Sequence, residues 1–165
     1  ASAEPSPAES YDLAFTQFRQ GDYAQALASF NEFAASNPKH DLADNALYWA
    51  GECLYSQKRF ADAVVAFKKV IAKYPNGSKV PDAYLKIGYA YLALDDQINA
   101  RIFLKEVIKN YPFSPASTKA EEKLKVFIFE LIDEKVAIVL SICKLISLAV
   151  AAGIKVISAK RNVSL

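Results

Sequence analysis

Histidine and cysteine are scarce in this sequence, and the side chains that commonly carry out catalysis are not grouped as a catalytic site. His40 is the one histidine, and no cysteine or second histidine lies near it in the sequence to complete a metal site. The adjacent acidic pairs Asp95-Asp96 and Glu121-Glu122 fall at a turn and at a helix start, where neighbouring side chains diverge. No GxSxG, HExxH, P-loop or GxGxxG motif is present. We therefore predict that the protein is not an enzyme, uses no cofactor and binds no metal, with His40 an exposed loop residue.

The remaining reactive groups and the charge also exclude several classes of protein. The two cysteines, Cys53 and Cys143, are too few for a disulfide framework. Both lie in apolar stretches with helical spacing, which predicts that they are buried free thiols. The 165-residue chain has a net charge of only +2, which gives no sign of a nucleic-acid surface.

Three segments of the chain repeat one another without gaps, and they define the elements that position all other side chains. Each segment ends in a proline, and these prolines are 37 residues apart. The aligned segments are Phe18–Pro38, Tyr55–Pro75 and Leu92–Pro112. Small residues recur in the same phase at Ala14, Gly51 and Gly88 and at Ala26, Ala63 and Ala100, and large ones at Phe30, Phe67 and Leu104.

Each repeated residue type predicts a feature of a helix pair. The small residues let two helices approach closely, and the large residues fill the space between neighbouring repeats. The proline cannot continue a helix, so it ends the second one. We expect a seventh helix from about Pro115, with a capping box formed by Ser117 or Thr118 and the glutamates that follow. The predicted helices are about 9–20, 22–36, 41–57, 60–73, 80–94 and 97–110, within about two to four residues at each end.

This pattern of small residues, alanine, aromatic residues and proline is similar to that of tetratricopeptide repeats, although the period is longer than the usual 34 residues. The extra residues fall in the connections after the second helices. These joints resemble the periplasmic repeat domain of the Tol-Pal system protein YbgF, also called CpoB. The segments that carry the resemblance are AESYDLAFTQFRQGDYAQALASFNEFAASNP, NALYWAGECLYSQKRFADAVVAFKKVIAKYP and SPASTKAEEKLK, within residues 9–125.

The resemblance implies an all-α fold, a right-handed α-solenoid of three helix pairs, located in the periplasm. It implies a scaffold that contacts a Tol-Pal or cell-wall synthesis component during cell division, with a partner peptide in the concave groove. Residues 1–8 would be a linker, and the repeats would span about 9–38, 41–75 and 80–112, with a capping helix over 115–125. The groove residues implied by the family alignment are Tyr11, Arg19, Asn45, Tyr48, Glu52, Tyr55, Asp82, Lys86 and Tyr89. Phe15 and Phe18 are expected in the core, and Trp49 borders the groove.

Residues 126–165 differ in kind from the repeats. The repeats hold 15 basic and 15 acidic residues over 1–125, whereas the tail holds five basic and three acidic residues and is mostly apolar. A helix with so wide an apolar surface is expected to bury that surface against another structure. The residues predicted to form an oligomer or tail interface are Ile132, Val136, Val139, Leu140, Ile142, Leu145, Ile146, Val150 and Ile154.

Four arrangements of this tail remain open from the sequence. The helix drives homo-oligomerisation, caps the last repeat, lies on a membrane surface, or spans a bilayer, the last being disfavoured by the central Lys144. Because the tail differs so much from the repeats, a designed or frame-shifted origin of residues 126–165 also remains open. The corresponding functions are a partner-binding scaffold, a self-assembly module or a membrane-surface adaptor.

Overall fold

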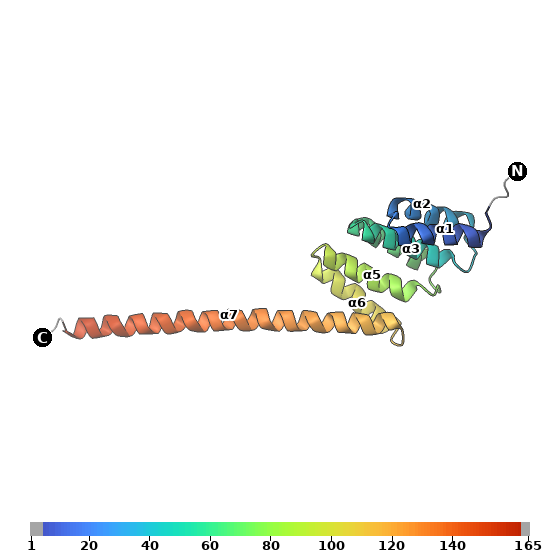
Figure 1. Cartoon of the computed structure of the whole chain (residues 1–165). Coiled ribbons are helices and arrows are strands. Elements are labelled where there is room, and N and C mark those ends of the chain that lie inside the picture. Colours follow the sequence, from blue (N-terminus) through green and yellow to red (C-terminus); the bar gives the residue numbers. More distant parts are fainter. Residues whose placement is uncertain (1–4, 163–165) are drawn as a thin grey trace. The chain divides into compact units, whose positions relative to one another are not determined.

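A computed structural model describes residues 5–162, with side chains described except at 128–131, 134, 149 and 151–162. The described residues form seven helices and no strand, and helices that follow one another in the sequence lie side by side in the repeat region (Figure 1). The helices are α1 (Pro7–Gln20), α2 (Tyr23–Ser36), α3 (Ala43–Ser56), α4 (Phe60–Lys73), α5 (Val80–Ala93), α6 (Gln97–Asn110) and α7 (Pro115–Asn162).

The described chain divides into two compact units. The first runs to Glu122, and the second begins at Lys123, so the first turns of α7 belong to the repeat unit. In the first unit each helix packs on the next, from α1 through α6. The predicted all-α solenoid of three helix pairs followed by a long helix is confirmed.

A close interlock between small and large residues holds each helix pair together. A Cβ atom added at Gly51 of α3 would lie 2.5 Å from the ring of Phe67 on α4, and one at Gly88 of α5 would lie 2.8 Å from Leu104 on α6. Both large side chains are fully buried. These contacts lie within a helix pair, whereas the sequence led us to expect the large residues between neighbouring repeats.

The turn inside each helix pair uses a left-handed backbone at one repeated position. Gly21, Lys58 and Asp95, which are 37 residues apart, have φ of 86°, 60° and 60°. Glycine adopts this conformation without steric penalty, but a lysine or aspartate pays about 1–2 kcal/mol for it. The turns at Lys58 and Asp95 therefore have a strained backbone, whereas the turn at Gly21 does not.

Serine side chains cap the first and last helices, at positions that differ from those expected. Ser6 and Glu9 form a capping box: Glu9 Oε2 accepts from the Ser6 N–H at 2.8 Å, and Ser6 Oγ accepts from the Glu9 N–H at 3.3 Å. Helix α1 therefore begins at Pro7, within the stretch expected to be linker. The capping box predicted at Ser117 is wrong, because Ser117 is buried inside α7 and its N–H donates to Ser114 Oγ at 3.1 Å.

The second unit contains the apolar part of α7. The predicted interface residues from Ile132 to Val150 are all exposed, and Ile154 lies outside the described side chains. Cys53 is buried as predicted, but the prediction for Cys143 is wrong, because this thiol is exposed. Within the described part of the chain, no helix meets the length and apolarity that a membrane crossing requires.

Candidate protein-binding face

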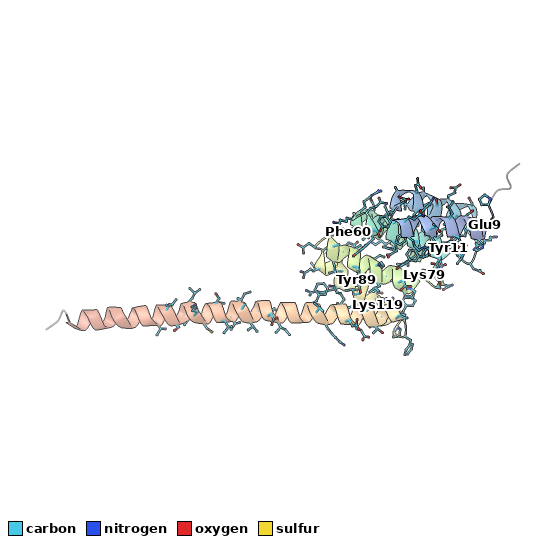
Figure 2. All side chains as sticks on the ribbon, in the orientation of Figure 1. Glu9, Tyr11, Phe60, Lys79, Tyr89 and Lys119 are labelled. Carbon is cyan, nitrogen blue, oxygen red and sulfur yellow. The ribbon has the colours of Figure 1, made fainter. Side chains whose placement is uncertain are left out.

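The first helices of the three pairs carry partly exposed polar and aromatic side chains, which we call the first-helix face: Tyr11, Asn45, Glu52, Tyr55, Asp82, Lys86 and Tyr89. It is formed by α1, α3 and α5, and Figure 2 labels Tyr11 on α1 and Tyr89 on α5. Between the first two pairs, the Tyr11 hydroxyl donates to Asn45 Oδ1 at 3.4 Å. Tyr11 and Asn45, which the sequence assigned to one groove, are therefore in contact.

An ion pair joins the second and third repeats at the centre of this face. Lys86 Nζ lies 2.6 Å from Glu52 Oε2, and the two side chains are only 24% and 13% exposed. The same ammonium lies 5.1 Å from the centre of the Tyr55 ring, at a distance that allows a cation–π interaction. The pair therefore positions Tyr55 and Lys86 together before any partner binds.

A second lysine covers one of the predicted groove tyrosines. Lys79 Nζ lies 5.4 Å from the centre of the Tyr48 ring and 3.8 Å from Asp82 Oδ2. The Tyr48 ring also packs on Phe67 at 5.5 Å, and the residue is only 8% exposed. Tyr48 is therefore part of the core, whereas Tyr55 and Tyr89 remain partly exposed on the first-helix face.

Burial dominates the electrostatics of this face. Loss of solvent raises the pKa of the Glu52 carboxyl, and the nearby Lys86 opposes this shift only in part. Burial likewise raises the pKa of the Tyr55 and Tyr89 hydroxyls. Both hydroxyls therefore stay protonated at neutral pH and can donate hydrogen bonds. Glu52 Oε1 is buried with no hydrogen-bond partner among the described residues. Burial therefore destabilises the charged carboxylate, whereas the ion pair with Lys86 stabilises it.

An aromatic cluster extends the first-helix face toward the N-terminal repeat. Trp49 of α3 packs edge-on against both Phe15 and Phe18 of α1, with ring centres 4.9 Å apart in each case. The Arg19 guanidinium lies 5.4 Å from the centre of the Phe15 ring. The three rings are half-buried, so Phe15 and Phe18 are neither fully in the core nor free. The sequence placed Trp49 only at the border of the groove. The signal that could have indicated this cluster is the spacing of Phe15 and Phe18, three residues apart on one side of a helix, together with the single tryptophan of the next repeat.

His40 has a structural role in the connection between the first two repeats. Its side chain is exposed in the loop, as predicted, and its Nδ1 accepts from the Leu42 N–H at 3.1 Å just before α3. Its ring lies edge-on to Phe33 at 5.4 Å. Among the side chains that the structure describes, no group of three or more His, Cys, Asp or Glu is placed to hold a metal ion.

A surface hollow of about 460 Å³ lies beside the connection between the second and third repeats, near His40 and Tyr74. At its base, the buried Asp44 carboxylate accepts from Ser78 Oγ and from the Lys79 N–H, both at 3.2 Å. A Cβ atom at Gly77 would lie 2.7 Å from Asp44 Oδ2. Asp44 therefore fastens the loop after α4 to the start of α3, and the hollow is the outer side of this joint.

Comparisons with known proteins identify the repeats. One family model described as a tetratricopeptide repeat matches residues 11–78, and a second with the same description matches residues 82–114. Comparison with curated protein sequences gave no match. These results support tetratricopeptide repeats and do not single out the Tol-Pal protein.

Solved structures share the fold at low sequence identity. The type III secretion translocator chaperone SycD of Yersinia enterocolitica is 18% identical with a TM-score of 0.64, covering 79% of this chain and 98% of that one. The N-terminal domain of stress-induced protein-1 from C. elegans is 15% identical with a TM-score of 0.60, covering 70% and 92%. The TPR domain of Arabidopsis FLU is 19% identical with a TM-score of 0.57, covering 66% and 96%. The repeat region of this chain, residues 11–114, belongs to the tetratricopeptide repeats.

Proposed function

We propose that this protein is a non-catalytic scaffold that holds a peptide segment of a partner protein on its first-helix face. The observation that carries the proposal is the central Glu52–Lys86 ion pair, at 2.6 Å, with the partly exposed Tyr55 ring held against it. Tyrosine combines an apolar ring with a polar hydroxyl and is enriched where proteins bind one another. The face therefore offers anchors that need little reordering on binding.

The first-helix face also has a balance of charge that bears on the kind of segment it binds. Glu52 pairs with Lys86, and Asp82 lies 3.8 Å from Lys79, so four of its charges are already matched. A strongly charged segment would have to break these pairs. A segment with apolar or aromatic anchors and uncharged polar groups fits the face better, because its hydroxyl and amide groups can meet the tyrosine hydroxyls.

Substitution of Tyr55 and Tyr89 tests the proposed site, because both side chains are partly exposed on the first-helix face. Peptides selected for binding to the wild-type chain serve as the probe, and affinity is measured by calorimetry. The double substitution Tyr55→Ala and Tyr89→Ala should weaken binding at least about tenfold, which corresponds to about 1.4 kcal/mol. Circular dichroism confirms that the helices remain folded.

A matched control uses exposed apolar residues on second helices. Val65 on α4 and Ile98 on α6 are 67% and 76% exposed. Their double replacement by alanine should leave peptide affinity unchanged. If the selected peptides bind the tyrosine variant as tightly as the wild type, or if the control loses as much affinity, the first-helix face is not the binding site.

A finer form of the proposal rests on the sequence resemblance described above. In this form the protein is periplasmic and its partner is a component of the Tol-Pal system or of cell-wall synthesis. The joints after the second helices, such as YPNGSKVPDAYLKIGYAYL, support it. Purified periplasmic domains of Tol-Pal proteins are the probes for a binding titration. Binding that is lost in the Tyr55 and Tyr89 double variant supports this form, and failure of every such domain to bind overturns it without affecting the general site.

A further inference from the structure

The apolar part of α7 carries one uninterrupted stripe with the spacing of a coiled coil. Its residues follow one another in steps of four and three, which keeps them on one side of a helix. We call this stripe the α7 seam. It consists of Ile132, Val136, Val139, Cys143, Ile146 and Val150, all of them exposed, and the five aliphatic residues are 50–57% exposed.

The other side of the same helix segment is less uniformly apolar than the seam, because a serine and a lysine lie there among the exposed Ile138, Leu145 and Leu148. Ser141 and Lys144 follow Val139 by two and five residues, which places both on the side of the helix away from Val139 at 3.6 residues per turn. Asp133 and Lys135 flank the seam only at its start. Between Val136 and Val150, therefore, the one charge lies away from the seam, and the seam itself is apolar.

The area of the seam is sufficient for a stable interface. Burying an aliphatic side chain removes on the order of 100 Å² from water, judged from its transfer free energy. The six seam residues with the adjacent Leu140 and Ile142 therefore offer about 800 Å² in each copy, which is what a standard interface buries on each partner. A stripe of this spacing is complementary to another helix with the same spacing.

We infer that the α7 seam binds the same seam of further copies of this chain, and that the protein assembles through α7. An identical helix is a suitable occupant because the seam bears no charge that would require an opposite charge on the partner. Leu140 and Ile142 are also exposed beside the seam, and β-branched residues occupy both of its alternating positions. These two features favour an assembly of more than two helices.

The full-length chain tests this inference, with Ile146→Glu as the variant and Leu148→Glu as its control. Leu148 is as exposed as Ile146, at 61% against 57%, but it follows Val139 by nine residues and so faces the opposite side. Light scattering during size exclusion should give the wild type a mass at least twice its 18.2 kDa. Ile146→Glu should raise the dissociation constant of the assembly at least tenfold, while Leu148→Glu should keep the wild-type mass.

Thiol labelling gives a second readout that does not depend on mass. Assembly should slow the labelling of Cys143, and Ile146→Glu should restore fast labelling. The buried Cys53, whose pKa is raised to about 12 by burial, should remain protected in both proteins and thereby show that the repeats stay folded. Peptide binding to the first-helix face should be the same in the variant, so this test is independent of the function proposed above.

Three results would overturn the inference. The first is a wild-type chain that stays monomeric at tens of micromolar, and the second is a Leu148→Glu variant that dissociates as readily as Ile146→Glu. The third is flotation of monomeric wild-type protein with phosphatidylcholine–phosphatidylglycerol vesicles and release by Ile146→Glu, because lipid rather than a second copy would then cover the seam.

Discussion

The repeat unit and the apolar part of α7 both consist of helices rich in large apolar residues, but the repeat unit buries these residues and the apolar part of α7 exposes them. In the repeat unit Phe30, Phe67 and Leu104 are completely buried, each from the second helix of a pair. In α7, Val139 and Leu140 are more than half exposed. The difference shows that apolar content alone does not indicate how a helix is covered. A 37-residue period supplies each helix with a partner in the same chain, whereas a heptad stripe needs a helix from elsewhere.

The largest expected effect is a loss of stability on truncating Phe67, the buried ring that packs on Gly51 in the repeat unit. Phe67→Ala should lower the free energy of unfolding of the repeat unit by about 3–5 kcal/mol, because a fully buried ring leaves a cavity against Gly51. Leu140→Ala should change it by less than about 0.5 kcal/mol, as expected for an exposed position. Chemical denaturation followed by Trp49 fluorescence measures both. Equal losses would mean that α7 is as much a part of the repeat core as α4.

An intermediate effect is expected at the strained turns. Lys58→Gly should raise the free energy of unfolding by up to about 1 kcal/mol, because glycine relieves the left-handed backbone at φ 60° but adds entropy to the unfolded chain. The gain at Asp95 should be smaller, since aspartate tolerates this conformation better than lysine. Gly21→Ala should be destabilising at φ 86°. Thermal melts rank the three variants, and a loss of stability in Lys58→Gly would contradict the strain.

The smallest expected effect concerns the ion pair on the first-helix face and depends on pH. Burial raises the pKa of Glu52 above its ordinary value of 4.5, so the folded state favours the neutral carboxyl and loses stability as pH rises through the raised pKa. Glu52→Gln is neutral at every pH. Its free energy of unfolding relative to wild type should therefore increase as pH rises and level off above the raised pKa.

Glu9→Gln is the control for this pH dependence, because it should show the opposite trend. The capping contacts with Ser6 lower the pKa of the Glu9 carboxyl, so its contribution is present above the ordinary pKa and is lost as pH falls. Denaturation curves at a series of pH values measure both variants. A Glu52→Gln curve parallel to that of wild type at all pH values would contradict the account of the buried carboxylate.

Most of the repeat fold could be predicted because its determining residues recur. Pro38, Pro75 and Pro112 set the ends of the second helices, and Gly51 and Gly88 marked the close approaches that the structure shows. Helix α1 starts two residues before its predicted start, because Ser6 and Pro7 lie in a segment whose composition resembles a linker. The capping box there depends on a Glu9 side chain folding back, which composition does not reveal.

The site could be predicted only in part, because its contacts depend on how successive helix pairs are offset. Tyr11–Asn45 and Glu52–Lys86 are both 34 residues apart, three fewer than the period. Each contact therefore reaches a residue about one helical turn earlier on the next first helix. Sequence periodicity cannot supply that offset. It also could not show that Lys79, from the following connection, covers Tyr48 while Tyr55 stays partly open.

The packing of each repeat helix mainly on the next one along the chain has a consequence for how the protein can evolve. The Gly51–Phe67 and Gly88–Leu104 interlocks lie within their own pairs, so duplicating or deleting a 37-residue unit would leave them intact and would change only the contacts between repeats. The contacts between repeats, such as Tyr11–Asn45 and Glu52–Lys86, would have to form again at the new junction. Whole repeats can therefore be gained or lost as units, which changes the length of the solenoid.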